Sequence, residues 1–283
     1  MLDIPGVLMM EFKEWSKLGY DPQLGLESYQ AVCIKHGFPS HMHDYYVFCY
    51  IEKGLQSFLY RKAKYLTPPG GLILLNPGDA HTGEPADVRG FEYRAVYPTV
   101  RHLQEAVYEL SGKWRDAPFF PEVRVDDPGL AGAMRALHQS LVAETPPLKR
   151  ESLFLMVLTR VIRQYAASNH ALPTPGREPN AVKRACQYIH DHAAEGITLT
   201  EVAESVHLSR YYFLRVFHDA IGMPPHAYLE SVRIGKARRL LEKGLPLNRV
   251  AQESGFSDQS HFTNRFKRLI GVTPGQYAHQ FRS

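Results

Sequence analysis

The feature that most constrains this sequence is a repeat in its last third. At an offset of 48 residues, the matching segments are 199–203 (LTEVA) with 247–251 (LNRVA), and 208–209 with 256–257. After one inserted residue, the matching pairs are Phe213 and Phe262, Phe217 and Phe266, Gly222 and Gly271, Pro225 and Pro274, and Tyr228 and Tyr277. Self-similarity at a nearly fixed period indicates two copies of one structural unit.

Each copy has the parts of two short helices joined by a turn. Thr198 or Thr200 can cap the first helix of the first copy, and the turn of the second copy contains Gly255, which is free to adopt a left-handed conformation. Ser209 and Ser257 are good N-cap residues for the second helices. Two phenylalanines four residues apart lie on one face of each second helix, pack it against a core and leave its opposite face exposed. This arrangement predicts a helix-turn-helix whose second helix can enter the DNA major groove.

A single helix is predicted between the two copies, over residues 225–243. Gly222 and Gly271 suit the C-terminal ends of the two second helices. The connecting helix would hold the motifs at a fixed separation, and second helices about 34 Å apart would fit successive major grooves. An all-helical interaction module without a nucleic-acid role is the alternative.

The first part of the chain is predicted to be β-structure followed by helices. From residue 26 to about residue 97, short runs rich in Val, Ile, Tyr and Phe alternate with turn clusters such as 76–79 (NPGD). Short strands at regular spacing favour a sandwich or small barrel. Apolar residues then recur at helical spacing over 100–111, 128–144 and 147–169.

The predicted domain boundary lies at residues 171–180, which contain three prolines and one glycine. Such a segment sustains neither a helix nor an interior strand and is therefore the predicted linker. The predicted fold class is α+β, with a β-barrel and helices over residues 1–170. The domain over 181–283 is expected to be all-α, with two helix-turn-helix motifs joined by a long helix.

The last predicted helix of the first domain carries a wide apolar stripe. Its members are Leu155, Leu158, Ile162 and Tyr165, widened by Val157 and Val161. A stripe of this width requires a partner, which is either the sheet or the same helix of a second subunit. We expect a homodimer formed through this region.

Composition places the excess positive charge in the C-terminal domain. Residues 177–283 hold 15 Lys+Arg against 10 Asp+Glu, whereas the preceding residues hold 18 against 19. A polyanion would bind where the basic excess lies. No apolar run of membrane-spanning length and no secretory signal are visible, and Cys33, Cys49 and Cys186 fit neither a zinc pattern nor a disulfide framework. We therefore expect a cytoplasmic protein that does not enter a membrane.

Residues 197–281 resemble the DNA-binding domain of AraC/XylS-type transcriptional regulators along their whole length. The most specific stretches are 247–267 (LNRVAQESGFSDQSHFTNRFK) and 271–277 (GVTPGQY). The resemblance implies that outward-facing side chains of both second helices contact double-stranded DNA. These residues are Arg210, Tyr211, Leu214 and Arg215 in the first helix, and Asp258, Gln259, Ser260, Thr263 and Asn264 in the second.

The chemistry of these side chains indicates which bases they would read. Arg215 can contact a guanine bidentately, Leu214 can touch a thymine methyl group, and Gln259 and Asn264 suit adenine. Contacts to the phosphates are expected from basic residues nearby, namely Lys236, Arg238, Arg239, Lys267 and Arg268.

Three histidines stand out in the β-rich region. His41 and His43 share one face if they lie on a strand, and His81 follows the turn at 76–79. Three converging imidazoles can bind Zn²⁺, Fe²⁺ or Ni²⁺. A metal-free pocket, in which the histidines contact a small molecule or fill the structure, is the alternative.

The spacing of these histidines resembles the two motifs of the cupin fold, His-x-His followed by Gly-x5-Pro-Gly-Asp-x-His. Metal-binding cupins usually add a glutamate four residues after the second histidine, and Val47 occupies that position here. We therefore expect neither a bound metal nor a cofactor. The resemblance implies a barrel pocket for a small-molecule effector, and the predicted effector-binding residues are His41, His43, Tyr45, His81, Glu84 and Tyr93.

The sequence thus predicts a ligand-responsive, sequence-specific DNA-binding regulator that is not an enzyme. An activator, which would contact RNA polymerase, is favoured slightly over a repressor. No nucleophile–base triad, phosphate-binding glycine loop or paired-carboxylate site is visible. Two alternatives are a metal-dependent cupin enzyme fused to a DNA-binding domain and a regulator switched by another protein.

Overall fold

The computed structural model describes residues 13–143, 145–167, 178–270 and 272–279. These residues form two compact units. The first unit contains the described residues up to Gln104, together with Asp116–Gln139 and the described residues 161–167. The second contains Glu105–Arg115, Ser140–Arg160 and the C-terminal helices.

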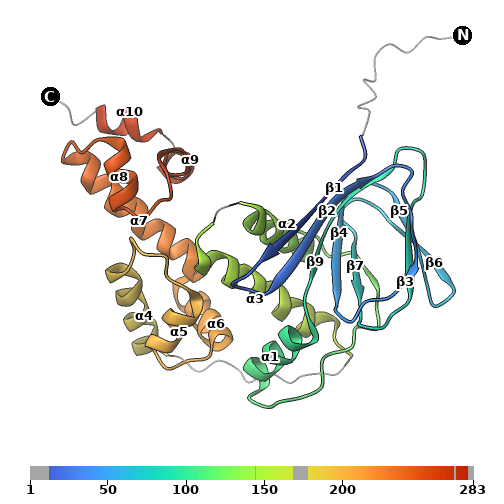
Figure 1. Cartoon of the computed structure of the whole chain (residues 1–283). Helices are drawn as coiled ribbons and strands as arrows, with labels where there is room; N and C mark the ends of the chain where they lie inside the picture. The colour runs from blue at the N-terminus through green and yellow to red at the C-terminus, as the bar shows by residue number, and fades with distance from the viewer. Residues whose placement is uncertain (1–12, 144, 168–177, 271, 280–283) are drawn as a thin grey trace, which may run out of the picture. The chain divides into compact units, whose positions relative to one another are not determined.

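The described strands of the first unit form two antiparallel sheets (Figure 1). In order across the six-stranded sheet lie β1 (Trp15–Asp21), β2 (Leu26–Cys33), β9 (Phe91–Tyr97), β4 (Val47–Gly54), β7 (Leu72–Leu75) and β10 (Arg124–Val125). The four-stranded sheet contains β3 (Phe38–His41), β8 (His81–Pro85), β5 (Gln56–Tyr60) and β6 (Ala63–Thr67). The predicted β-rich region is confirmed, although β1 begins before residue 26 and was not predicted.

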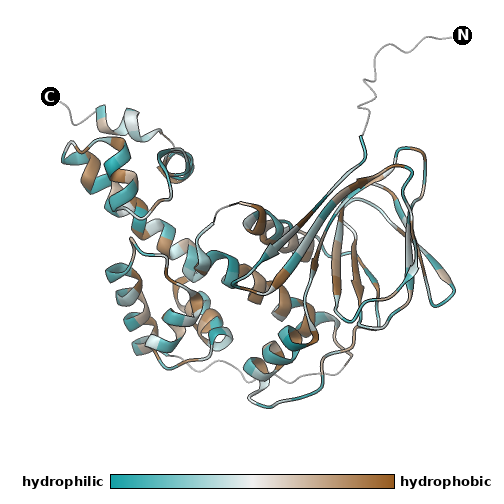
Figure 2. Cartoon of the chain, viewed as in Figure 1, coloured by the Kyte–Doolittle hydropathy of each residue, from teal (hydrophilic) through white to brown (hydrophobic). Residues whose placement is uncertain are grey.

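The two sheets enclose one apolar core. Ile51 of β4 and Phe58 of β5 come from different sheets, belong to the same buried cluster and are at most 1% exposed. In Figure 2, β4 and β7 are largely apolar along their length. Such runs are typical of strands that are covered on both faces.

Three helices follow the strands within the predicted bounds. They are α1 (Val100–Ser111), α2 (Pro128–Val142) and α3 (Pro147–Tyr165). The apolar stripe of α3 is already covered within the single chain, because Leu155 and Ile162 are 7% and 2% exposed. The stripe therefore does not require a second subunit to cover it, and the homodimer stays a prediction.

The second unit contains the helices of the C-terminal domain. They are α4 (Pro179–Asp191), α5 (Leu199–Ser205), α6 (Arg210–Ile221), α7 (Pro225–Glu242), α8 (Leu247–Glu253), α9 (Gln259–Ile270) and α10 (Pro274–His279). The predicted linker extends two residues too far, because α4 already begins at Pro179. Proline is tolerated in the first turn of a helix because backbone N–H groups there have no intrahelical acceptor, so its lack of an N–H costs no hydrogen bond. Residues 171–177 of that linker lie outside the described residues.

Local capping explains where the helices of the first motif begin and end. Thr198 and Glu201 form a capping box at α5, and Ser209 accepts a hydrogen bond from the backbone N–H of Tyr212 at α6. Gly222 ends α6 with a left-handed φ of 79°. The corresponding Gly271 lies outside the described residues. None of the described helices combines the length and apolarity needed to cross a membrane.

Candidate functional site

The first unit contains a cavity of about 360 Å³ between its two sheets. Aromatic rings, histidines and aliphatic side chains form most of its wall. The lining residues are Tyr29, Phe38, His41, His43, Val47, Cys49, Gln56, Phe58, Ile73, Leu75, His81, Thr82, Gly83, Tyr93 and Tyr97. A concave, mainly apolar space with a few polar groups is typical of a small-molecule site.

Strand pairing brings two of the cavity histidines together, and the third, His43, lies in the loop after β3. His41 of β3 lies opposite His81 of β8 in the antiparallel register. The ring centroids are 4.4 Å apart for His41 and His81, 4.7 Å for His41 and His43, and 5.4 Å for His43 and His81. One ring nitrogen from each histidine lies within 4.8 Å of the other two. The convergence predicted from the sequence is therefore present in the fold.

Backbone carbonyl groups orient two of these imidazoles. Nδ1 of His41 lies 2.7 Å from the carbonyl oxygen of Pro39, and Nδ1 of His81 lies 2.9 Å from that of Asp79. A carbonyl oxygen only accepts hydrogen bonds, so each Nδ1 carries the proton. In the neutral form of either ring, Nε2 is therefore the nitrogen that keeps a free lone pair.

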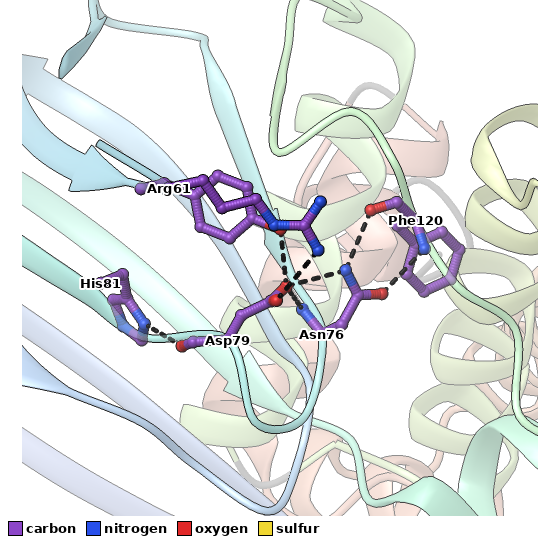
Figure 3. A network of polar contacts seen from close by, with 6 residues as sticks. Arg61, Asn76, Asp79, His81 and Phe120 are labelled. Carbon is purple, nitrogen blue, oxygen red and sulfur yellow. Dashed lines mark hydrogen bonds and ion pairs between the residues drawn. The ribbon is translucent and has the colours of Figure 1, made fainter. Parts of the chain in front are cut away.

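A polar network holds the turn that precedes His81 (Figure 3). The carboxylate of Asp79 accepts hydrogen bonds from the side-chain amide of Asn76, at 2.9 Å, and from the hydroxyl of Tyr60, at 3.1 Å. Asn76 also exchanges two hydrogen bonds with the backbone of Phe120, at 2.8 and 2.9 Å. The backbone N–H of Gly78 donates to the carbonyl of His43 at 2.7 Å, so the same turn is tied to a second histidine.

Burial favours the neutral form of two histidines of the cavity, His43 and His81. Desolvation and the neighbouring rings lower the pKa of His43 from 6.5 to about 4, and desolvation lowers the pKa of His81. Burial also raises the pKa of Tyr93 and Tyr97, so both phenols stay protonated. These four side chains therefore present neutral nitrogen and hydroxyl groups to the cavity.

Four of the six predicted effector-binding residues line the cavity. These are His41, His43, His81 and Tyr93. Tyr45 stacks on His43, with ring centroids 4.6 Å apart, but is not part of the lining. Glu84 is exposed and contacts Ser57 and Lys64, each at 3.3 Å. Its predicted place in the pocket was wrong, because its side chain is exposed and it is not among the residues that line the cavity.

Sequence reasoning missed several aromatic and polar members of the lining. Tyr97 lies four positions after Tyr93 on β9, and Tyr29 lies opposite Ala95, between them, on β2. The two-residue period of a strand could have identified Tyr97 from Tyr93. Tyr29, Phe38 and Gln56 come from other strands, and only the pairing of those strands brings them to the cavity.

On α6, the first helix predicted to contact DNA, three of the four predicted residues are either buried or paired with another side chain. Tyr211 and Leu214 are 4% and 6% exposed, so the expectation that they face outward was wrong. Arg210 is partly exposed, but its guanidinium donates to the carboxylate of Glu109, with the Nε contact at 2.9 Å. Arg210 must leave Glu109 before it can contact a base. Arg215 is also partly exposed.

The second recognition helix, α9, presents its predicted residues to the surface. Gln259, Ser260 and Asn264 are exposed, and Thr263 is partly buried. Asp258, rather than Ser257, caps this helix, because its carboxylate accepts the backbone N–H of His261 at 2.7 Å. This hydrogen bond lowers the pKa of the Asp258 carboxyl. Four of the five residues expected to contact phosphates are exposed, namely Arg238, Arg239, Lys267 and Arg268. The fifth, Lys236, is partly buried.

A buried arginine ties α7, which lies between the two helix-turn-helix motifs, to the segment after α4. Arg233 of α7 is 4% exposed and donates to the carbonyl oxygens of Ala193, at 2.6 Å, and Glu195, at 2.8 Å, after α4. Gly255, in the turn of the second motif, packs against the same segment. A Cβ atom at Gly255 would lie 2.7 Å from Cα of Ala194. Arg233 of α7 and Gly255 of the second motif thus both contact the segment between α4 and α5, and the sequence pattern did not indicate this position for Arg233.

Comparisons with known proteins match both the strand-rich N-terminal part and the helical C-terminal part of the chain. A family model of the AraC-like ligand-binding domain matches residues 24–158, and a helix-turn-helix domain model matches residues 202–280. An uncharacterized HTH-type transcriptional regulator of Bacillus subtilis (strain 168), YbfI, is 37% identical over 88% of this chain and 90% of its own length. The chain belongs to the AraC/XylS family of transcriptional regulators.

Two further proteins share lower or more local similarity with the chain. The arabinose operon regulatory protein of Escherichia coli (strain K12) is 26% identical over 76% of this chain and 73% of its own length. The solved C-terminal domain of AraT, a response regulator from Geobacillus stearothermophilus, is 34% identical over 37% of this chain and 87% of that domain, with a TM-score of 0.35. This AraC-family regulator thus combines a ligand-binding domain with a helix-turn-helix DNA-binding domain, and its relatives are regulators rather than enzymes.

Proposed function

We propose that this regulator responds to a small-molecule effector, which binds in the cavity of the first unit and changes sequence-specific DNA binding by the second. The cavity is the observation that carries the proposal. Its volume of about 360 Å³ lies within the range of small-molecule sites, roughly 300–1,000 Å³. A regulator switched only by another protein would need no such space, so the cavity favours a ligand.

The lining indicates what kind of molecule fits. Tyr29, Tyr93 and Tyr97 supply flat, mainly apolar walls, whereas the histidines gather at one place on the wall. We therefore expect an effector with an apolar or aromatic body and one polar group that contacts the histidines. Its binding can shift the regulator only through a difference in affinity between two conformations.

The DNA-reading surface is proposed to consist of the accessible residues of α6 and α9. Arg215 and Arg210 would contact bases from the first helix, and Gln259 and Asn264 would contact adenines from the second. The basic excess of the C-terminal region supports the phosphate contacts. Ser260 and Thr263 lie on the same surface of α9 and complete the proposed set.

A selection from genomic fragments with the purified full-length chain tests the DNA-binding part. Gel-shift titrations at two salt concentrations then separate specific binding from phosphate attraction. Arg215→Ala should weaken the selected site by about 1–3 kcal/mol and relax the preference at one base pair. Arg249→Ala is the matched control, because Arg249 is exposed on α8 and pairs with Glu253. No enriched sequence, with or without added metabolites, would contradict the proposal.

Thermal-shift screening of metabolites tests the effector part. The genes beside the selected site narrow the set of candidates. A true effector should raise the melting temperature of the wild type and alter its gel shift, and His43→Ala should abolish both effects. Glu84→Ala should leave both unchanged, because Glu84 lies outside the cavity. An effector response that survives in His43→Ala would contradict the proposed site.

We further propose that the regulator acts as a homodimer and as an activator that contacts RNA polymerase. The apolar stripe of α3 is covered, so the dimer must use another surface. Sedimentation velocity with and without the selected DNA measures the oligomeric state. Transcription in vitro with RNA polymerase distinguishes the two directions of control, since an activator raises and a repressor lowers the yield of transcript.

A further inference from the structure

The first strand of the six-stranded sheet carries three exposed apolar side chains. Trp15, Leu18 and Tyr20 of β1 are 43%, 65% and 64% exposed. β1 lies at one edge of its sheet, and no strand among the described residues pairs along its second edge (Figure 1). The backbone N–H and C=O groups of such an edge can form hydrogen bonds with another strand. The edge of β1 is therefore a candidate surface for a protein partner.

Both ends of β1 are fixed, so its edge already has the conformation that strand pairing requires. The carboxylate of Glu14 accepts the backbone N–H groups of residues 34, 35 and 36, at 2.7, 2.6 and 2.8 Å. At the other end, Asp21 accepts the N–H groups of Gln23 and Leu24, each at 3.0 Å. All seven residues of β1 pair with β2. A strand that is already ordered loses little conformational entropy when it binds a partner.

The edge lacks the features that keep other strands away. Strands at open edges are commonly short, or they carry charges and prolines that prevent further pairing. β1 is seven residues long and contains no proline, and its two charged residues are Lys17 and Asp21. Lys17 is exposed, whereas Asp21 is 8% exposed. An ordered, apolar edge of this kind is expected to bind a further strand.

We infer that β1 pairs in antiparallel orientation with β1 of a second copy of this chain, with Gly19 opposite Gly19 on the two-fold axis. The inference rests on the proposed homodimer and gives it a surface. In this register Leu18 lies opposite Tyr20 of the partner subunit, and Lys17 lies opposite Asp21 of the partner subunit. Directly opposite residues of an antiparallel pair point to the same face and interact. The two-fold symmetry repeats each of these pairs.

Charge distinguishes this register from its neighbours. An axis at Lys17 would place two lysines directly opposite each other. An axis at Leu18 would place Trp15 opposite Asp21 of the partner subunit and would leave Lys17 opposite a glycine. Like charges opposite each other are destabilising, and opposite charges are stabilising. Of these three registers, the one centred on Gly19 pairs the apolar side chains with each other and each charge with its opposite.

This self-complementarity identifies the partner as a second copy. Residues 17–21 supply both members of each pair, which is the property of an interface formed around a two-fold axis. A different protein would need its own strand with a matching pattern of apolar and charged side chains.

Sedimentation velocity of the full-length chain tests the surface. The wild type should sediment as a dimer, and Leu18→Arg should weaken dimerisation by at least about 10-fold, because the symmetry places each substitution in the interface twice. Leu66→Arg is the matched control, since Leu66 is 51% exposed on β6, an edge strand of the other sheet, and it should leave the dimer unchanged. Cooperative thermal unfolding shows that both variants fold.

A charge reversal tests the polar pair. Lys17→Glu places a carboxylate opposite Asp21 of the partner subunit and should weaken dimerisation by about 3-fold or more. Lys183→Glu makes the same change at an exposed position of α4 and should have no effect on the dimer.

Oxidative cross-linking tests the register. Opposite residues of an antiparallel pair have Cα atoms about 4.5–5.5 Å apart, a separation that a disulfide can span. A chain with both Leu18→Cys and Tyr20→Cys should therefore form a covalent dimer when it is oxidised. Leu18→Cys alone should not, because it would cross-link only if the axis lay at Leu18. The wild type, which contains Cys33, Cys49 and Cys186, gives the background.

The interface and the homodimer fail by different results. A dimer that resists both Leu18→Arg and Lys17→Glu, or a double variant that cross-links no more than the wild type, would overturn the interface and leave the homodimer in place. A wild type that stays monomeric with and without the selected DNA would overturn both. None of these results bears on the proposed effector site.

Discussion

The amide of Asn76 should be among the most stabilising side chains of the first unit. Asn76 is 6% exposed and bridges the turn before His81 to the backbone of Phe120, which is fully buried (Figure 3). Its Oδ1 accepts the N–H of Phe120 at 2.8 Å, and its Nδ2 donates to the Phe120 carbonyl at 2.9 Å. Asn76→Ala would leave both backbone groups without these partners.

The expected cost follows from those two groups. A buried polar group that loses its partner costs about 1–3 kcal/mol, so Asn76→Ala should lower the free energy of unfolding by about 2–6 kcal/mol. Asn76→Asp should not restore stability. Its carboxylate can accept the N–H of Phe120 but cannot donate to the carbonyl, and it adds a negative charge beside Asp79.

Equilibrium urea unfolding measures this loss. Trp114→Phe removes one of the two tryptophans, so the fluorescence of Trp15 on β1 then reports on the first unit. Glu122→Ala, an exposed substitution two residues from Phe120, should change the free energy of unfolding by less than about 0.5 kcal/mol. A loss below about 1 kcal/mol for Asn76→Ala would refute the reasoning, because the buried groups would then have found other partners.

Three further substitutions test the second unit. Gly255→Ala should cost about 2–4 kcal/mol, because its φ is +82° and the new Cβ would lie 2.7 Å from Cα of Ala194; circular dichroism during urea unfolding measures the loss. Phe266→Ala should cost about 3–5 kcal/mol in the same assay, because it removes a fully buried ring. Burial, and then the charge of Lys149, lower the pKa of His226 from 6.5 to about 4. Its stabilising contribution is therefore complete above pH 6.5 and falls as the pH drops towards 4, by about 2 kcal/mol at pH 5. His226→Gln should remove that part of the pH dependence, and equal pH profiles for wild type and variant would contradict it.

The sequence alone determined the features that depend on neighbouring residues. Thr198, Ser209 and Gly222 cap helices through hydrogen bonds and backbone angles within a few positions of each residue. The duplicated pattern of phenylalanines marked the cores of both motifs for the same reason, since residues four apart share a helix face. Both the regulator family and the presence of a β-domain before the helices followed from such local patterns.

Only the tertiary structure decided which side chains meet across strands and helices. Tyr29 and Phe38 enter the cavity because of strand pairing that no short window of sequence contains. Tyr211 is buried although its position on α6 resembles that of an outward-facing residue. Periodicity shows that residues share a face, but not what covers that face, because long-range packing decides which faces are buried.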